Sequence, residues 1–152
     1  MSDVVSPELM LANMVVQVLI LIFLVYGAVD FKVNKNAMRH GIVFTIATFA
    51  NLVSLAVVML PSLIGQWSSL VQDPFDSSNL LTSVHHILGL IAAILSVIIA
   101  VHWIVGVSGK RETRTSLSKC IGRNRSGKMV MRITFALWVA SFALGVLIYA
   151  LS

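Results

Sequence analysis

Apolar residues along this chain gather into four long blocks that are separated by short polar segments. The blocks run from about Leu9 to Val29, from His40 to Leu60, from Leu80 to Val107 and from Met129 to Leu151. Each block is long enough to cross a hydrocarbon layer of about 30 Å as an α-helix that rises about 1.5 Å per residue. The pattern therefore predicts an all-α integral membrane protein, a four-helix transmembrane bundle with one domain over residues 1–152.

The second block is expected to end at Pro61, where a polar connector begins. This connector, Pro61–Asn79, is only weakly hydrophilic, and its Trp67 and Phe75 suit a loop or short helix that lies on the bilayer surface. The residues Asp76-Ser77-Ser78-Asn79 at its end are of the types that cap the start of a helix, here the third span.

The basic residues indicate how the chain crosses the membrane. All 11 lysines and arginines lie in or beside two connectors, Asp30–Arg39 and Ser108–Lys128, and the other polar segments have none. Basic residues concentrate on the cytoplasmic side of membrane proteins. We therefore expect these two connectors in the cytoplasm, and both termini and Pro61–Asn79 on the outer side of a plasma membrane that the chain crosses four times.

The composition agrees with this interpretation. The chain is 58% apolar and 11% charged, with a mean hydropathy of +0.94, whereas roughly 25% of the residues of a soluble domain are charged. The net charge of +5 does not indicate nucleic-acid binding, because it lies in two loops that flank membrane spans. The expected partners are anionic lipids at the cytoplasmic basic loop and other membrane subunits or further copies of the chain.

The chain lacks the residue patterns of common catalytic sites. Its single Cys120 excludes an internal disulfide and a multi-cysteine zinc or iron–sulfur site. It has no phosphate-binding loop, dinucleotide fingerprint or nucleophile elbow. Glu8 and Asp30 lie only at span edges, so a proton relay through carboxylates lacks its parts. We therefore expect a protein that is not an enzyme.

Neutral polar residues also lie within the predicted spans. Asn13 and Gln17 are four residues apart and share one face of the first span, and Thr48 and Asn51 lie in the second. Residues of these types commonly form hydrogen bonds between membrane helices. The sequence leaves open whether these two polar faces meet.

The four histidines are the main candidates for a binding site, because ionisable residues in membrane spans are costly and often functional. His40 and His102 lie at similar depth on the predicted cytoplasmic side of two spans, as two ligands of one b-type haem would. His85 and His86 lie at the outer end of the third span. His86 and His102 are 16 residues apart, which is about 24 Å along a helix and about 160° around it, so they belong to separate sites.

Three methionines lie at a depth similar to that of the outer histidines: Met10, Met14 and Met59. A histidine–methionine pair can ligate haem, and imidazole combined with soft thioethers suits Cu(I). These methionines with His85 and His86 are therefore a candidate outer metal site. The alternative is that the histidines lie at the membrane surface or form hydrogen bonds, and bind no cofactor.

The fourth span resembles the last helix of a known family, the prokaryotic domain-of-unknown-function four-twenty family of short four-helix membrane proteins. The resemblance rests on Met131-Arg132-Ile133-Thr134-Phe135-Ala136-Leu137-Trp138, followed by Gly145-Val146-Leu147-Ile148-Tyr149. They are similar to the family's basic lead-in, Thr-Phe-x-Leu-Trp segment and terminal Gly-x-x-x-Tyr. Arg39-His40 and His86-Ile87 resemble its histidine-bearing helix starts, so the resemblance covers about residues 10–152. The histidines also give a weaker similarity to small b-type cytochromes.

Some members of that family are associated with haem-copper oxidase genes. The resemblance therefore implies an accessory or assembly subunit of a respiratory electron-transport complex, which is the function we expect. The chain departs from the family pattern at Met59-Leu60-Pro61 and at Gly127-Lys128, where the family often has a tyrosine and histidines. Two alternatives stay open: a b-type haem protein that transfers electrons, and a protein that binds copper on the outer side.

Overall fold

The computed structural model describes residues 6–108 and 125–151, which form α-helices and one π-helical segment with no strand among them. The elements are α1 (Pro7–Asn34), α2 (Ala37–Ser54), η1 (Leu55–Met59), α3 (Leu60–Gln72), α4 (Ser77–Ser108) and α6 (Arg125–Leu151). Four helical stretches are long and apolar enough to cross a membrane: Glu8–Asn34, Ala37–Gln72, Ser77–Val105 and Met129–Leu151. The predicted all-α bundle of four membrane-length helices is confirmed. Cys120 and most of the second basic connector lie outside the described residues.

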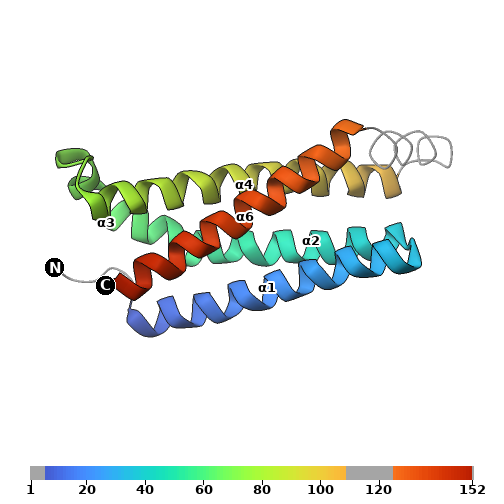
Figure 1. Cartoon of the computed structure of the whole chain (residues 1–152), viewed down its shortest axis with the longest axis horizontal. Coiled ribbons are helices and arrows are strands. Elements are labelled where there is room, and N and C mark those ends of the chain that lie inside the picture. Colours follow the sequence, from blue (N-terminus) through green and yellow to red (C-terminus); the bar gives the residue numbers. More distant parts are fainter. Residues whose placement is uncertain (1–5, 109–124, 152) are drawn as a thin grey trace.

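The helices run side by side, and the elements divide between two ends of the bundle (Figure 1). The start of α1, the end of α6 and α3 lie at one end, and the α1–α2 turn lies at the other. We call the first the acidic end, after Glu8, Asp73 and Asp76, and the second the basic end, after Lys32, Lys35, Arg39 and Arg132. The side of the membrane that each end faces stays a prediction from the basic residues.

Most large apolar side chains of the bundle face outward. Only 11% to 28% of the residues in the apolar windows of the four spans are buried inside the protein. A protein in water could not keep so many large apolar side chains on its surface, because each square ångström of exposed apolar surface costs about 25 cal/mol. Lipid is the solvent that suits these helices.

The predicted connector Asp30–Arg39 is almost entirely helical. α1 continues to Asn34 and ends where Lys35 adopts a left-handed conformation with φ of 54°. Asn36 caps α2 by accepting a hydrogen bond from the backbone N–H of Arg39 at 3.1 Å. The turn between the helices is therefore two residues long, which makes α1 and α2 antiparallel neighbours.

The prediction that the second span stops at Pro61 is wrong, because α2, η1 and α3 form one continuous helical stretch over Ala37–Gln72. The π-helical turn just before the proline explains the difference: the backbone N–H of Leu60 bonds to the carbonyl of Leu55, five residues back. A π-helical turn is wider than an α-helical one, so it accommodates the proline ring and its missing N–H donor. The stretch of 36 residues would be about 54 Å long, so it reaches beyond a hydrocarbon layer of about 30 Å.

The true α3–α4 connector is Asp73–Asp76, much shorter than the predicted Pro61–Asn79. Asn79 joins the two helices, because its side-chain amide donates to the carbonyls of Asp73 at 2.9 Å and Ser69 at 3.2 Å. Phe75 is 89% exposed at the tip of this turn. The tight turn fixes the start of α4, the helix that carries His85 and His86.

Asp76 caps α4, as its sequence predicts, and this gives a pH-dependent expectation. The hydroxyl of Ser78 and the backbone N–H groups of Asn79 and Ser78 donate to its carboxylate, and they hold the pKa of Asp76 below its usual value. Because the pKa is lower in the folded state, the cap stabilises α4 above the unfolded pKa, and this is lost as the pH falls through the folded pKa. We expect hydrogen-exchange protection factors at the start of α4 to fall selectively below about pH 4.

The matched variant for this measurement is Asp76→Asn, which keeps a capping oxygen and removes the titration. Its protection at the start of α4 should not depend on acidity over this range. Protection in the unaltered protein that is equally insensitive to acid would contradict the capping role of the carboxylate.

A buried apolar cluster joins α1, α2, α4 and α6 at Ile20, Leu24, Ala47, Ala92 and Trp138. The two alanines on facing helices let the backbones approach closely.

A polar layer adjoins this cluster. The side-chain amide of Gln17 donates to Asn51 at 3.2 Å and to Ser54 at 2.8 Å, and the Trp138 indole donates to the Gln17 oxygen at 3.4 Å.

The polar faces of α1 and α2 therefore meet, which the sequence left open. Ser54 completes the layer by donating to the side-chain oxygen of Asn13. Thr48 is buried too, but its hydroxyl has no hydrogen-bond partner in the described part of the chain. The polar layer is thus made by Asn13, Gln17, Asn51 and Ser54.

Candidate metal-binding cavity

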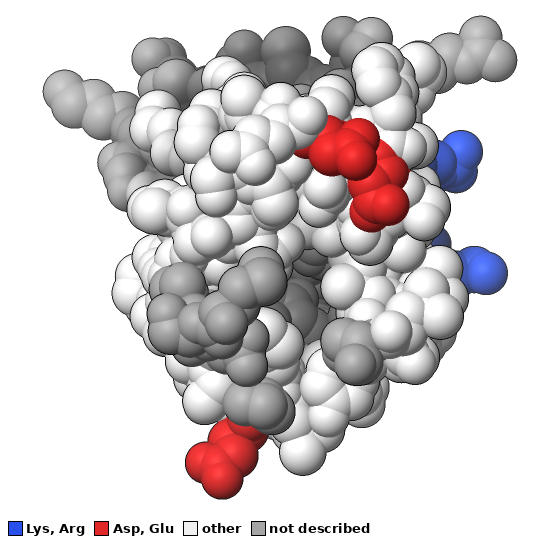
Figure 2. All heavy atoms as spheres, turned by 90° about the vertical axis from the view of Figure 1, so that its left-hand side faces the viewer, with Lys and Arg blue, Asp and Glu red and all other residues white. Residues whose placement is uncertain are grey.

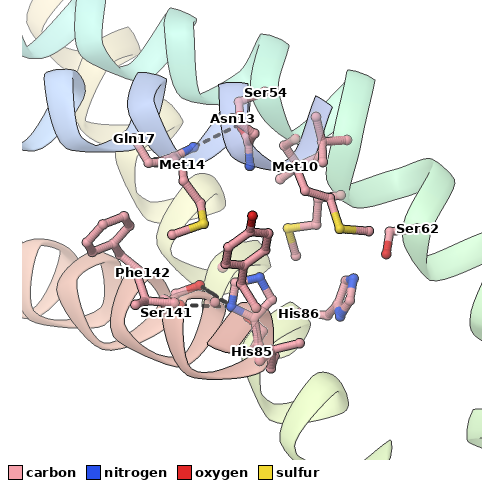
Figure 3. Close-up of a pocket in the computed structure, with 18 of the residues that line it drawn as sticks. Met10, Asn13, Met14, Gln17, Ser54, Ser62, His85, His86, Ser141 and Phe142 are labelled. Carbon is pink, nitrogen blue, oxygen red and sulfur yellow. Dashed lines mark hydrogen bonds between the residues drawn. The ribbon is translucent and has the colours of Figure 1, made fainter. Parts of the chain in front are cut away.

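A cavity of about 370 Å³ lies at the acidic end, enclosed by α1, the α2–η1–α3 stretch, α4 and α6 (Figure 3). Among the described residues that line it, none is charged and none is a cysteine. The lining residues that matter for binding are Met10, Asn13, Met14, Gln17, Asn51, Ser54, Met59, Ser62, Thr82, His85, His86 and Ser141. Figure 2 views the acidic end and shows a hollow near the centre of this face, with acidic side chains above it and at the lower edge, and basic ones only at the right margin.

His85 is fixed by α6. Its Nδ1 lies 2.8 Å from the backbone carbonyl of Ser141, and the Ser141 hydroxyl donates in turn to the carbonyl of His85 at 3.2 Å. A carbonyl only accepts hydrogen bonds, so Nδ1 carries the proton. In the neutral form of the ring, Nε2 is therefore the nitrogen that keeps a lone pair. The ring lies directly against Gly145, where an added Cβ would be 3.0 Å from its Cε1 atom.

His86 is fixed within its own helix in the same way. Its Nδ1 lies 2.7 Å from the carbonyl of Thr82, and the residue is only 7% exposed. The two imidazole rings lie edge to face, with centroids 5.4 Å apart and planes at 82°. Nε2 of His86 is thus also the ring nitrogen that remains for a metal ion. A hydrogen bond from the other ring nitrogen to a carbonyl is the arrangement usual for metal-ligating histidines.

The thioethers of Met10, Met14 and Met59 line the same cavity as the two imidazoles. Met10 and Met14 come from α1 and project toward the histidines of α4 across the cavity (Figure 3). Met59 is the last residue of η1 and packs on Gly89 of α4, where an added Cβ would be 3.3 Å from its sulfur. The fold brings together all five residues of the candidate outer metal site.

A metal ion bound in this cavity would need methionine sulfur atoms among its ligands. Among the described residues, no three histidine, cysteine or acidic side chains lie close enough together to hold an ion. Two imidazoles and up to three thioethers form a neutral, soft set of donors, which suits Cu(I) far better than Zn²⁺ or Mg²⁺.

His40 and His102 are not brought together as the pair of haem ligands that the sequence suggested. Trp103 of α4 faces α2 and lies so close to Gly41 that an added Cβ there would be 1.9 Å from its ring. Successive residues of a helix point about 100° apart, so His102 is turned away, and it is exposed on the bundle surface. His40 instead places its Nδ1 3.0 Å from the carbonyl of Gly27 and packs against Phe31.

The sequence did not identify the residues that support the cavity. The carbonyls of Thr82 and Ser141 orient the two imidazoles, and Ser54 completes the polar layer at the cavity wall. Ser141 and Gly145 had a visible signal, since small residues four apart let helices approach closely. That signal indicates packing, and only the structure shows that a histidine fills the space.

Comparisons of the chain with protein-family models, with curated proteins and with solved structures find no match. The fold and the cavity define the class: a membrane protein of four helices with an interhelical cavity lined by histidine and methionine. The resemblance to a family of small membrane proteins stays an expectation from the sequence.

Proposed function

We propose that this protein is a non-enzymatic accessory protein of the plasma membrane that binds one Cu(I) ion in the cavity at the acidic end. The observation that carries the proposal is the convergence on one cavity of three thioethers and two imidazoles, each held through its Nδ1 so that Nε2 remains for a metal ion. These residues come from α1, η1 and α4, so only the folded bundle assembles the set.

The chemistry of the wall favours a soft monovalent ion. Thioether sulfur and imidazole nitrogen are neutral ligands, and no carboxylate among the described lining residues offers the hard oxygen that Mg²⁺ or Ca²⁺ prefers. A neutral ligand set in a membrane interior also leaves less net charge to bury with a monovalent ion than with a divalent one.

The surroundings of the cavity favour a cation over an anionic ligand. Glu8, Asp73 and Asp76 lie at this end of the bundle, and the chain has no lysine or arginine between residues 40 and 109. Haem carries two propionates that are usually paired with basic side chains or water, and no lysine or arginine that the structure describes lines this cavity. Together with the separation of His40 from His102, this makes a b-type haem the less favoured cofactor.

The role in the cell follows from the resemblance noted in the sequence. An accessory or assembly subunit of a respiratory complex that contains copper would need a membrane site that holds Cu(I) and releases it. Positive charges at the basic end support a topology in which that end is cytoplasmic and the cavity opens on the outer side. The exposed apolar faces of the spans are the surfaces on which other membrane subunits or further copies would pack.

Copper binding is tested on the detergent-purified full chain under reducing conditions. We expect one equivalent of Cu(I) to be retained against the chelator bicinchoninate, with sulfur and nitrogen ligands in the X-ray absorption spectrum. The same preparation should show no reducible Soret band. A Soret band would replace the proposal with the haem alternative, and failure to retain Cu(I) in competition would overturn the copper site.

A further inference from the structure

A second cavity, of about 350 Å³, lies toward the basic end of the bundle, between α6 and the α1–α2 pair. It arises because α6 crosses the bundle at an angle: it packs along α4 and meets α1 at only a few positions (Figure 1). The wall consists of Leu24, Ala28, His40, Phe44, Met131, Arg132, Thr134, Phe135 and Trp138. None of these except Trp138 lines the candidate metal-binding cavity.

The wall is apolar and aromatic, and its polar groups are largely occupied. The Thr134 hydroxyl, almost completely buried, donates to the carbonyl of Val130 at 2.9 Å. His40 uses its Nδ1 on the carbonyl of Gly27. A hydrocarbon chain matches such a surface, because it needs no hydrogen-bond partner and fills space between large side chains.

Arg132 is the one charged residue among those that the structure describes in this wall. It lies three residues after Met129, at which the fourth span begins, so its guanidinium can reach the membrane surface while its stem covers apolar surface. In the described part of the chain, no carboxylate forms an ion pair with it. A cation in that position, with neighbouring basic residues at the same end, favours binding of an anion at the level of the lipid head groups.

We propose that this cavity binds one anionic phospholipid, with an acyl chain among Leu24, Phe44 and Phe135 and the phosphate on Arg132. The apolar wall and the single cation match the two halves of such a lipid. A phosphate accepts two parallel hydrogen bonds from a guanidinium, which distinguishes this site from general attraction between basic loops and a negative bilayer. The acidic end has an opposite charge and would not bind the same head group.

The site is tested with the full chain by native mass spectrometry, with phosphatidylglycerol and phosphatidylcholine added at equal concentration to the delipidated protein. We expect one molecule of phosphatidylglycerol to be retained in preference. Arg132→Gln should reduce its retention about tenfold, as the loss of one charge-assisted contact would. Arg132→Lys should restore part of the difference.

Arg39→Gln is the matched control, because it removes a positive charge at the same end from a residue outside the cavity wall. It should leave retention of phosphatidylglycerol within about twofold, as expected for an exposed charge outside the wall. Equal retention of the two lipids, or an equal loss in Arg39→Gln and Arg132→Gln, would overturn the site and leave only general attraction to anionic lipid. Retention of inorganic phosphate by delipidated protein would show that the head group alone is recognised, and would overturn the role of the acyl chain.

Discussion

Replacing both His85 and His86 with alanine is expected to abolish Cu(I) retention, with a loss of affinity of roughly 100-fold or more. Among the described residues, these rings are the only imidazoles in the wall of the cavity, and the bond from each Nδ1 to a backbone carbonyl leaves Nε2 for a metal ion. The measurement is competition for Cu(I) against a chelator of known affinity, with the purified variants compared at equal protein concentration.

The contribution of sulfur is separated by Met14→Leu and Met59→Leu. Leucine is close to methionine in volume, so these changes keep the packing and remove the ligand. Each should weaken Cu(I) retention by about tenfold, a change that a purely structural role of the methionine would not produce. His102→Ala is the matched control, because this exposed histidine lies outside the cavity. Equal binding by the unaltered protein and the double histidine variant would show that copper binds elsewhere.

The second large effect is expected at Gly41, where Gly41→Ala should destabilise the bundle. An alanine Cβ would lie 1.9 Å from Cε2 and 2.0 Å from Nε1 of Trp103, so α2 and α4 must separate or the indole must leave its position. Overpacking of this kind typically costs about 1–3 kcal/mol, and the depth of this overlap places the variant at the upper end. The measurement is the midpoint of thermal unfolding in detergent.

Gly65→Ala is the control for this substitution. Gly65 lies exposed in α3, where alanine is favoured over glycine by up to about 1 kcal/mol in a helix. Its unfolding midpoint should stay the same or rise. The double variant Gly41→Ala/Trp103→Leu should lose less stability than the two single variants lose when their losses are added. Additive effects would contradict direct contact between positions 41 and 103.

The four spans could be predicted from the sequence because long apolar blocks have one stable arrangement in lipid. The error at Pro61 has a physical cause. A proline normally ends a helix, but the π-helical turn at Leu55–Met59 accommodates the missing N–H donor of the proline. The residue types in that turn do not predict a π-helix. The polar residues between Asp30 and Arg39 likewise gave no sign that helices would continue through them to a two-residue turn.

The candidate site could be predicted in part. Equal depth along the spans grouped His85 and His86 with the three methionines, and the structure places all five on one cavity. Equal depth also grouped His40 with His102, and the structure does not bring these two residues together. The position of a residue in the sequence gives its depth in the membrane but not the side of the helix on which its side chain lies. In α4 the side that faces α2 is occupied by Trp103, so a ligand at position 102 points elsewhere.

The π-helical turn lets the chain between Ser54 and Leu60 hold an additional residue without displacing α3. It contains one residue more than an α-helix of the same rise would use, so a chain one residue shorter there would close as an α-helix and leave α3 in its position. One residue lost within α2, where no additional residue is present, would instead rotate everything beyond it by about 100°. Met59 would then leave its position on Gly89, and α3 would turn a different face toward the start of α4. The cavity should therefore tolerate a deletion in the π-helical turn and not one in α2.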